Sequence, residues 1–171
     1  MRNIGSIFNS QAEGCAVCHE EIRTCHSNKH PHRGTGGRMS NSVSTHLMFF
    51  GAASEAMELY QSEFDEFKIQ AIHKYGDSDG EMAGKIKIAK VKFADHDLII
   101  IDSPPVHDFT FTPAMSLFVD FEDTADLDHA FEVLSSNGKV FMPLDNYGFS
   151  PRFGWVQDRF GVSWQLNLKP K

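Results

Sequence analysis

Apolar and polar residues follow a regular pattern from about residue 42 to residue 168, whereas residues 1–38 show neither helical nor strand periodicity. Apolar runs or alternations bounded by turn-forming residues are typical of strands, and an apolar stripe at about every third or fourth position is typical of a helix. In the first half of the patterned region these rules predict a strand at 43–50, a helix at 53–64, strands at 67–75, 85–94 and 98–102, and a loop at 76–80.

The predicted strand at 85–94 contains one irregularity. Ile86 and Ile88 share one parity, while Ala89 and Val91 share the other. Because side chains alternate between the two faces of a strand, this switch indicates a β-bulge near residues 88–89.

The second half repeats the order of elements. It predicts a strand at 115–121, a helix from the N-cap Thr124 to about Ser136 with Gly138 just beyond it, and strands at 139–144, 153–158 and 163–168. The order β-α-β-β-β therefore occurs twice, offset by about 70 residues. The sequence predicts an α+β fold of two tandem βαβββ modules, at 42–103 and 113–168.

The opening strands of the two modules align, with residues 46–49 on residues 116–119. Alternation then assigns one set of side chains to the face under the helices, namely Leu47, Phe49, Leu117 and Val119. It assigns the other set to the opposite face, namely His46, Met48, Ser116 and Phe118.

Residues 1–38 are polar and contain all three cysteines, Cys15, Cys18 and Cys25. The run from Cys15 to His19 is a CxxCH sequence, which is the attachment signature of c-type haem, but the chain shows no export signal for that chemistry. Zinc on these cysteines and neighbouring histidines is a second alternative, although the spacing matches no familiar finger. A disordered leader without a metal is the third.

The leader also raises the question of where translation starts. Residues 35–37 precede Met39, and codons for Thr-Gly-Gly can contain the purine-rich tract of a bacterial ribosome-binding sequence. We therefore expect that Met39 is the true start and that residues 1–38 are translated upstream sequence. The nucleotide sequence tests this expectation, since codons without such a tract would contradict it.

The composition excludes several classes of function. The formal net charge of −7 argues against a nucleic-acid partner. No apolar run approaches the roughly 20 residues of a membrane-spanning helix, and no apolar signal region follows the N-terminus, so the cytoplasm is the default location. The patterned region also lacks a nucleophile elbow, a P-loop, a His-Glu-x-x-His motif and any cysteine.

Two stretches resemble the PhnB-like branch of the vicinal-oxygen-chelate superfamily, which includes glyoxalase and bleomycin-resistance proteins. The first comprises HLMFFG at 46–51 and EAMELY at 55–60, and the second, longer and more specific, is GWVQDRFGVSWQL at 154–166. The resemblance implies that the two modules form an incomplete barrel with a ligand cavity in its concave side. Branch members often carry a domain name that refers to 3-demethylubiquinone-9 3-methyltransferase, but the Gly-rich stretch at 34–37 lacks the flanking strand and helix of a Rossmann-type methyltransferase.

Enzymes of this superfamily hold a divalent metal on the first and last strands of the modules, so the resemblance implies which positions would supply ligands. They are His46, Ser116, Gln165 and either Ile101 or Asp102, because the register there is ambiguous by one residue. Gln165 stands where the superfamily has a ligand glutamate, and a neutral amide is a weaker ligand. A set of His46, Asp102 and Gln165 for Mn, Ni, Zn or Fe requires Asp102 to point inward, and the sequence favours a weakened or absent metal site.

The resemblance and the strand parity together give the side chains expected to line the cavity, namely His46, Met48, Asp102, Ser116, Phe118, Trp155 and Gln165. Three functions remain open. The first is a homodimeric binder of a small, partly apolar molecule. The second is a metal-dependent lyase, isomerase, dioxygenase or thiol transferase, and the third is a non-catalytic regulatory or interaction protein.

Overall fold

The computed structural model describes residues 41–170 of the chain. The expectations for residues 1–38, including the start at Met39 and the metal alternatives at Cys15, Cys18 and Cys25, lie outside these residues. No helix in the described part of the chain is both long and apolar enough to cross a membrane.

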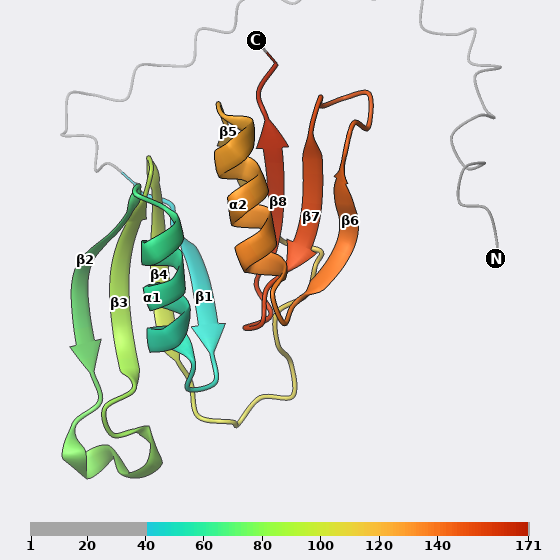
Figure 1. Cartoon of the computed structure of the whole chain (residues 1–171). Helices are drawn as coiled ribbons and strands as arrows, with labels where there is room; N and C mark the ends of the chain where they lie inside the picture. The colour runs from blue at the N-terminus through green and yellow to red at the C-terminus, as the bar shows by residue number, and fades with distance from the viewer. Residues whose placement is uncertain (1–40, 171) are drawn as a thin grey trace, which may run out of the picture. The chain divides into compact units, whose positions relative to one another are not determined.

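The first module is a four-stranded sheet with one long helix (Figure 1). Its elements are β1 (Thr45–Phe49), α1 (Ala53–Glu63), β2 (Phe67–Lys74), the 3₁₀ helix η1 (Asp77–Met82), β3 (Ile86–Phe93) and β4 (His96–Asp102). The strand order is β1-β4-β3-β2, with β1 parallel to β4 and the other pairs antiparallel.

The second module has the same topology. Its elements are β5 (Leu117–Phe121), α2 (Thr124–Ser135), β6 (Lys139–Asp145), β7 (Phe153–Gln157) and β8 (Ser163–Leu168). The strand order is β5-β8-β7-β6, again with one parallel pair, β5 and β8. The predicted α+β fold of two βαβββ modules is therefore confirmed, and the two sheets are not closed into a barrel.

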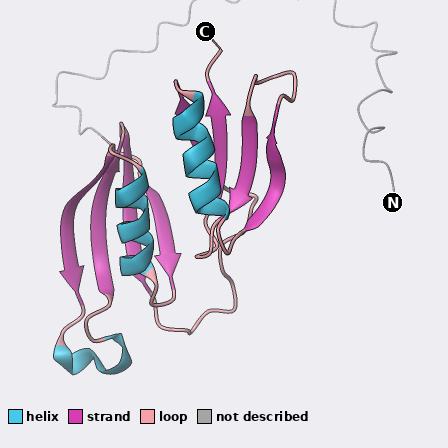
Figure 2. Cartoon of the chain, viewed as in Figure 1, coloured by secondary structure: helices cyan, strands magenta, loops and turns pink. Residues whose placement is uncertain are grey.

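Each helix covers one face of its own sheet (Figure 2). Leu47 and Phe49 of β1 are buried on the helix side, and Leu117 and Val119 of β5 are half-buried against the same core, whereas the residues between them are more exposed. The predicted parity of the opening strands is thus confirmed. No helix among residues 41–170 covers the opposite face of either sheet, and we call these two surfaces the open face of module one and the open face of module two.

The helix-side core is continuous between the modules. Tyr60 of α1 is fully buried and meets the ring of Trp164 edge-on at 4.9 Å, and Phe64 stacks on the same indole at 5.4 Å. The Tyr60 hydroxyl donates a hydrogen bond to Asp158. Because aromatic rings bury large apolar areas, these contacts hold α1 against module two through one shared core.

The two ends of α2 differ from the predictions by one residue each, because neighbouring residues can fill the same capping position. Asp123, not Thr124, caps α2, since its side chain accepts hydrogen bonds from the backbone of Ala125 and Asp126. Gly138 was predicted to follow the helix end, but Asn137 is the residue that adopts the left-handed conformation typical of that position. Gly138 is needed for a different reason, because a Cβ there would lie 2.2 Å from the backbone oxygen of Gln157.

The loop predicted at 76–80 is largely taken up by η1, which spans Asp77–Met82. The expected bulge in β3 is present within about two residues of its predicted place. Lys87 is the extra residue, because the ladder passes from the pair His73–Ile88 to the pair Lys74–Ile86.

Candidate functional site

The open face of module two is a grid in which polar side chains occupy the central strand β8 and aromatic side chains flank it in the second row. Its position follows from β8, the central strand, whose residues 163, 165 and 167 all point away from α2. The side chains form three rows across the strands, each given in the order β5, β8, β7, β6. The first row is Ser116, Ser163, Gln157 and Lys139. The second row is Phe118, Gln165, Trp155 and Met142, and the third row is Asp120, Asn167, Phe153 and Asp145.

A neutral hydrogen-bond network joins the first two rows. Ser116 Oγ and Ser163 Oγ lie 2.7 Å apart, so one hydroxyl donates to the other. Trp155 Nε1 donates to Ser163 Oγ at 2.9 Å, and Gln165 Nε2 donates to Ser116 Oγ at 3.2 Å. The network therefore connects three predicted cavity residues: Gln165 bonds Ser116 directly, and Ser163 links Ser116 to Trp155.

Sequence analysis missed Ser163, although the signal was available. It precedes Gln165 by two positions on the same strand, so alternation places both on the same face. Ser163 is only 2% exposed, and its hydroxyl is held by Trp155 and Ser116.

Aromatic side chains border this network. Phe118 is 56% exposed, and its ring lies 6.3 Å from that of Phe153 in the next row. Trp155 is half-buried and packs against Phe141 at 5.0 Å. The surface therefore offers apolar walls around a few polar atoms, which is the usual composition of a small-molecule site.

The open face of module one is apolar at its centre and basic at one side. His46 and Met48 of β1 lie beside Ile99 and Ile101 of β4, and all but the exposed His46 are half-buried. Charged side chains on this face include those of Lys68, Lys90, Lys92 and Asp97. Lys92 and Asp97 form an ion pair of 3.2 Å.

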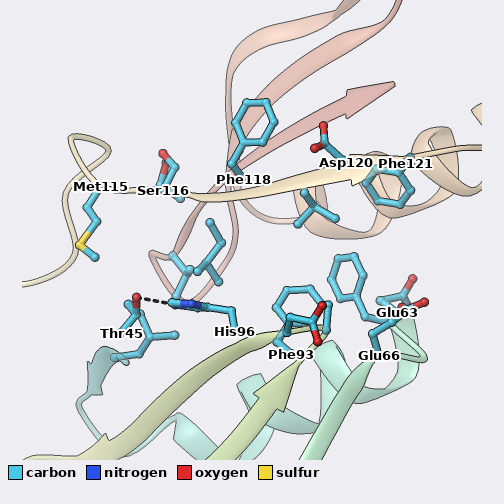
Figure 3. A pocket seen from close by; sticks show the side chains of 18 of the residues that line it. Thr45, Glu63, Glu66, Phe93, His96, Met115, Ser116, Phe118, Asp120 and Phe121 are labelled. Carbon is cyan, nitrogen blue, oxygen red and sulfur yellow. Dashed lines mark hydrogen bonds between the residues drawn. The ribbon is translucent and has the colours of Figure 1, made fainter. Parts of the chain in front are cut away.

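A groove of about 1430 Å³ runs between β1 and the β3–β4 turn of module one and β5 of module two. Of the predicted cavity residues, His46, Ser116 and Phe118 line it. Figure 3 shows Ser116 and Phe118 on one side of β5, and Phe121 on the other side, towards Phe93. The groove and the open face of module two therefore meet along the edge of β5, and Ser116 and Phe118 belong to both.

The end of the groove near α1 and α2 is acidic. Glu63 Oε2 is buried and lies 3.3 Å from His129 Nε2, without a well-oriented hydrogen bond from any described residue. The other carboxylates there are those of Asp65, Glu66, Glu122, Asp123 and Asp126. This charge disfavours approach of an anion from that end.

Asp102 was predicted to line the cavity, but it lies on the opposite face of its sheet. It is 1% exposed and lies on the helix side of β4, where Ala53 N donates to Oδ1 at 3.0 Å and Ile86 N donates to Oδ2 at 2.9 Å. The register is therefore the other one of the two considered, and Ile101 faces the open side. The carboxylate serves as a remote cap for α1, whose own N-cap residue, Ala52, has no side-chain oxygen.

The predicted metal ligands do not form a set that fits a divalent cation. Asp102 is engaged on the opposite side of its sheet from His46, and Gln165 donates its amide to Ser116. Within residues 41–170, no three His, Cys, Asp or Glu side chains come together in a way that could hold a metal. A catalytic site of this kind normally has three protein ligands.

Two βαβββ modules with open sheet faces define the vicinal-oxygen-chelate class of folds. A domain of this class from Frankia sp. EAN1pec, described as a glyoxylase/bleomycin resistance protein/dioxygenase domain, matches 77% of this chain and 99% of its own with a TM-score of 0.54 at 14% identity. That likeness concerns the fold alone.

Within this class, the chain belongs to the family described as 3-demethylubiquinone-9 3-methyltransferase, whose model matches residues 41–167. A similar solved structure is the putative 3-demethylubiquinone-9 3-methyltransferase, PhnB protein, from Bacillus cereus. It is 42% identical, covers 75% of this chain and 100% of its own, and has a TM-score of 0.71. Protein YjdN of Escherichia coli strain K12 is 26% identical over 144 residues, which are 74% of this chain and 94% of that protein.

Proposed function

We propose that this protein binds a small, partly apolar molecule on the open face of module two and that it does so without a divalent metal. The observation that carries the proposal is the network of Ser116, Ser163, Trp155 and Gln165, in which every member is neutral. A neutral polar network between aromatic side chains favours a ligand that combines a flat apolar body with a few polar atoms.

The methyltransferase in the family description does not enter the proposal. A Rossmann-type methyltransferase has a parallel sheet wound on both sides by helices. The described part of this chain has two separate four-stranded sheets, each with one parallel pair. We therefore assign ligand binding to an open sheet face rather than to a nucleotide-type site.

The proposal extends to a homodimer in which the two kinds of open face meet. Met48, Ile99 and Ile101 leave a half-buried apolar surface on module one, which a second copy would cover. The lysines of that face outnumber its one aspartate, whereas the open face of module two carries Asp120 and Asp145 against Lys139. Opposite net charges favour contact between unlike faces, with the ligand site between them.

The test of the binding function uses quinoline, a small molecule with one polar atom. We expect saturable binding to the full chain, measured by calorimetry. Phe118→Ser should weaken it severalfold, because about 1 kcal/mol of aromatic contact is lost. Phe109→Ser is the matched control, since Phe109 lies in the segment between the modules and is 57% exposed, against 56% for Phe118.

Binding that stays unchanged in Phe118→Ser would contradict the assigned surface. The absence of saturable binding would contradict the proposed function itself. The homodimer is tested separately by sedimentation: Ile101→Lys should yield monomers, whereas Ile72→Lys, on the helix side of β2, should leave the dimer intact. A monomeric wild-type chain would contradict this part of the proposal.

A further inference from the structure

The donors and acceptors of the network that make no hydrogen bond within the described residues indicate the chemistry of a complementary ligand. A serine hydroxyl has one proton to donate and two lone pairs to accept with, and a glutamine side chain has two N–H donors and a carbonyl oxygen. The donors and acceptors already used can be counted from the contacts of Ser116, Ser163, Trp155 and Gln165.

The two serines together leave one hydroxyl proton free. If Ser163 donates to Ser116, the lone pairs of Ser116 are filled by Ser163 and Gln165, and the Ser116 proton remains. If Ser116 donates to Ser163, the lone pairs of Ser163 are filled by Ser116 and Trp155, and the Ser163 proton remains. In both arrangements one O–H proton is unused, and it is accessible to a ligand when Ser116 carries it, because Ser163 is only 2% exposed.

Gln165 keeps both kinds of capacity. One of its N–H groups donates to Ser116, and the other has no acceptor among the described residues. Its carbonyl oxygen Oε1 likewise receives no hydrogen bond from the part of the chain that the structure describes. The half-buried amide therefore presents a donor and an acceptor side by side.

Aromatic side chains flank the Gln165 amide on both neighbouring strands. Phe118 stands opposite it on β5 and Trp155 opposite it on β7, so the central row reads aromatic, amide, aromatic. Side chains directly across neighbouring strands lie close enough to contact the same bound group. A flat ligand that reaches Gln165 would thus lie between or against two aromatic rings.

Charged groups lie away from that central row. Asp120 accepts a hydrogen bond from Asn167 at 2.6 Å in the third row. Lys139 stands at the far end of the first row with its ammonium 5.1 Å from the ring of Phe141. A net charge on a ligand at Gln165 would have no adjacent counter-charge on this face, and desolvating an unpaired charge is unfavourable.

We propose that Gln165 selects neutral, planar amide- or lactam-bearing ring compounds by pairing its own amide with theirs, with the free serine hydroxyl as a further donor. The inference rests on the proposed function, because it specifies the ligand class of the same surface. The ligand N–H would donate to Gln165 Oε1, while the ligand carbonyl would accept from Gln165 Nε2 or from the serine hydroxyl.

The experiment compares probes of one shape: 2-quinolone, which is a neutral lactam, quinoline, which lacks the lactam, and quinoline-2-carboxylate, which is an anion. Calorimetry on the full chain should give a dissociation constant for 2-quinolone about tenfold below that of quinoline, because each added neutral hydrogen bond has a modest net effect. Quinoline-2-carboxylate should bind more weakly than both.

Two variants identify the residue responsible. Gln165→Met keeps the length of the side chain and removes the amide, so the preference for 2-quinolone should disappear while quinoline binding remains. Gln157→Met is the control: Gln157 is a second glutamine on the same face, but its amide donates to Gly161 O at 2.9 Å and it lies in another row. It should keep the preference.

The outcomes separate the two proposals. Equal affinity for quinoline and 2-quinolone, or a preference that survives in Gln165→Met, would overturn the ligand class and leave the binding surface standing. Tightest binding of the carboxylate would also overturn it. Failure of every probe to bind saturably would overturn the inference together with the proposed function.

Discussion

The hydroxyl of Tyr60 donates a hydrogen bond of 2.5 Å to Asp158 Oδ2 and so ties the helix of module one to the last turn of module two. Asp158 is 3% exposed and also accepts from Trp164 Nε1 and from the backbone N–H groups of Phe160 and Val162. A buried carboxylate with four donors is fully satisfied, which explains how it can lie within an aromatic core.

Tyr60→Phe should lower the free energy of unfolding by about 1.5–3 kcal/mol, because it removes a buried hydrogen bond to a charged acceptor. Urea denaturation monitored by circular dichroism measures the change. Tyr147→Phe is the control, since its exposed hydroxyl donates to Pro143 O, and the expected loss is about 0.5 kcal/mol or less. Equal losses in both variants would contradict the role assigned to the Tyr60–Asp158 contact.

The same contact predicts a dependence of stability on alkaline pH. Burial, followed by the negative charge of Asp158, raises the pKa of Tyr60 well above its usual value. Tyr60 therefore stabilises the folded state fully below the unfolded pKa of about 10, and this contribution is lost as the pH rises from there towards the folded pKa.

Denaturation between pH 8 and pH 11 should therefore show a steeper loss of stability in the wild type than in Tyr60→Phe. The extra slope can reach about 1.4 kcal/mol per pH unit, which is the limit for one proton. Parallel curves for the two proteins would show that Tyr60 ionises equally easily in the folded and unfolded chains.

Asp102 gives a prediction about the start of α1. Asp102→Ala should destabilise the protein by about 2–4 kcal/mol, because the buried N–H groups of Ala53 and Ile86 lose their acceptor. Asp97→Ala, on the exposed face of the same strand, removes only an ion pair with Lys92 and should change stability by less than about 1 kcal/mol. Thermal unfolding compares them, and a mild effect of Asp102→Ala would refute the capping role.

The sequence predicted correctly which face of the sheet the residues of β1 occupy, but it did not do so for Asp102 on β4. Alternation correctly assigned Leu47 and Phe49 to the helix side, where both are buried. At Ile101 and Asp102 alternation left the register ambiguous by one residue, and Asp102, the residue expected in the cavity, lies on the helix side instead. A helix that begins at Gly51-Ala52-Ala53 has no local cap, and its free N–H groups require a distant acceptor that periodicity cannot reveal.

The network around Gln165 illustrates the same limit. The family resemblance located Ser116, Trp155 and Gln165 on one face, and the structure links them. The hydrogen bonds of Ser116 to Ser163 and Gln165 depend on the pairing of β5 with β8, which is distant from it in sequence. Strand order could be inferred from the fold class, but the direction of each hydrogen bond could not.

The ligand set of His46, Asp102 and Gln165 yields a prediction about metals. Metal content after dialysis against Mn²⁺, Ni²⁺ or Zn²⁺ should be the same in the wild type, His46→Ala and Gln165→Leu, because these side chains converge on no common point. Comparison with variants is essential, because the cysteines of residues 1–38 are a separate source of ligands. One equivalent of metal lost in His46→Ala would contradict the metal-free proposal.

The most direct test of the central claim is a titration of the ¹⁵N-labelled full chain with 2-quinolone, followed by nuclear magnetic resonance. The two indole N–H signals report on the two sides of module two, since Trp155 bonds Ser163 on the open face and Trp164 bonds Asp158 in the core. Binding on the open face should shift the Trp155 indole and Gln165 amide signals saturably and leave the Trp164 signal in place. Saturable shifts that spare Trp155 and Gln165 would contradict the account.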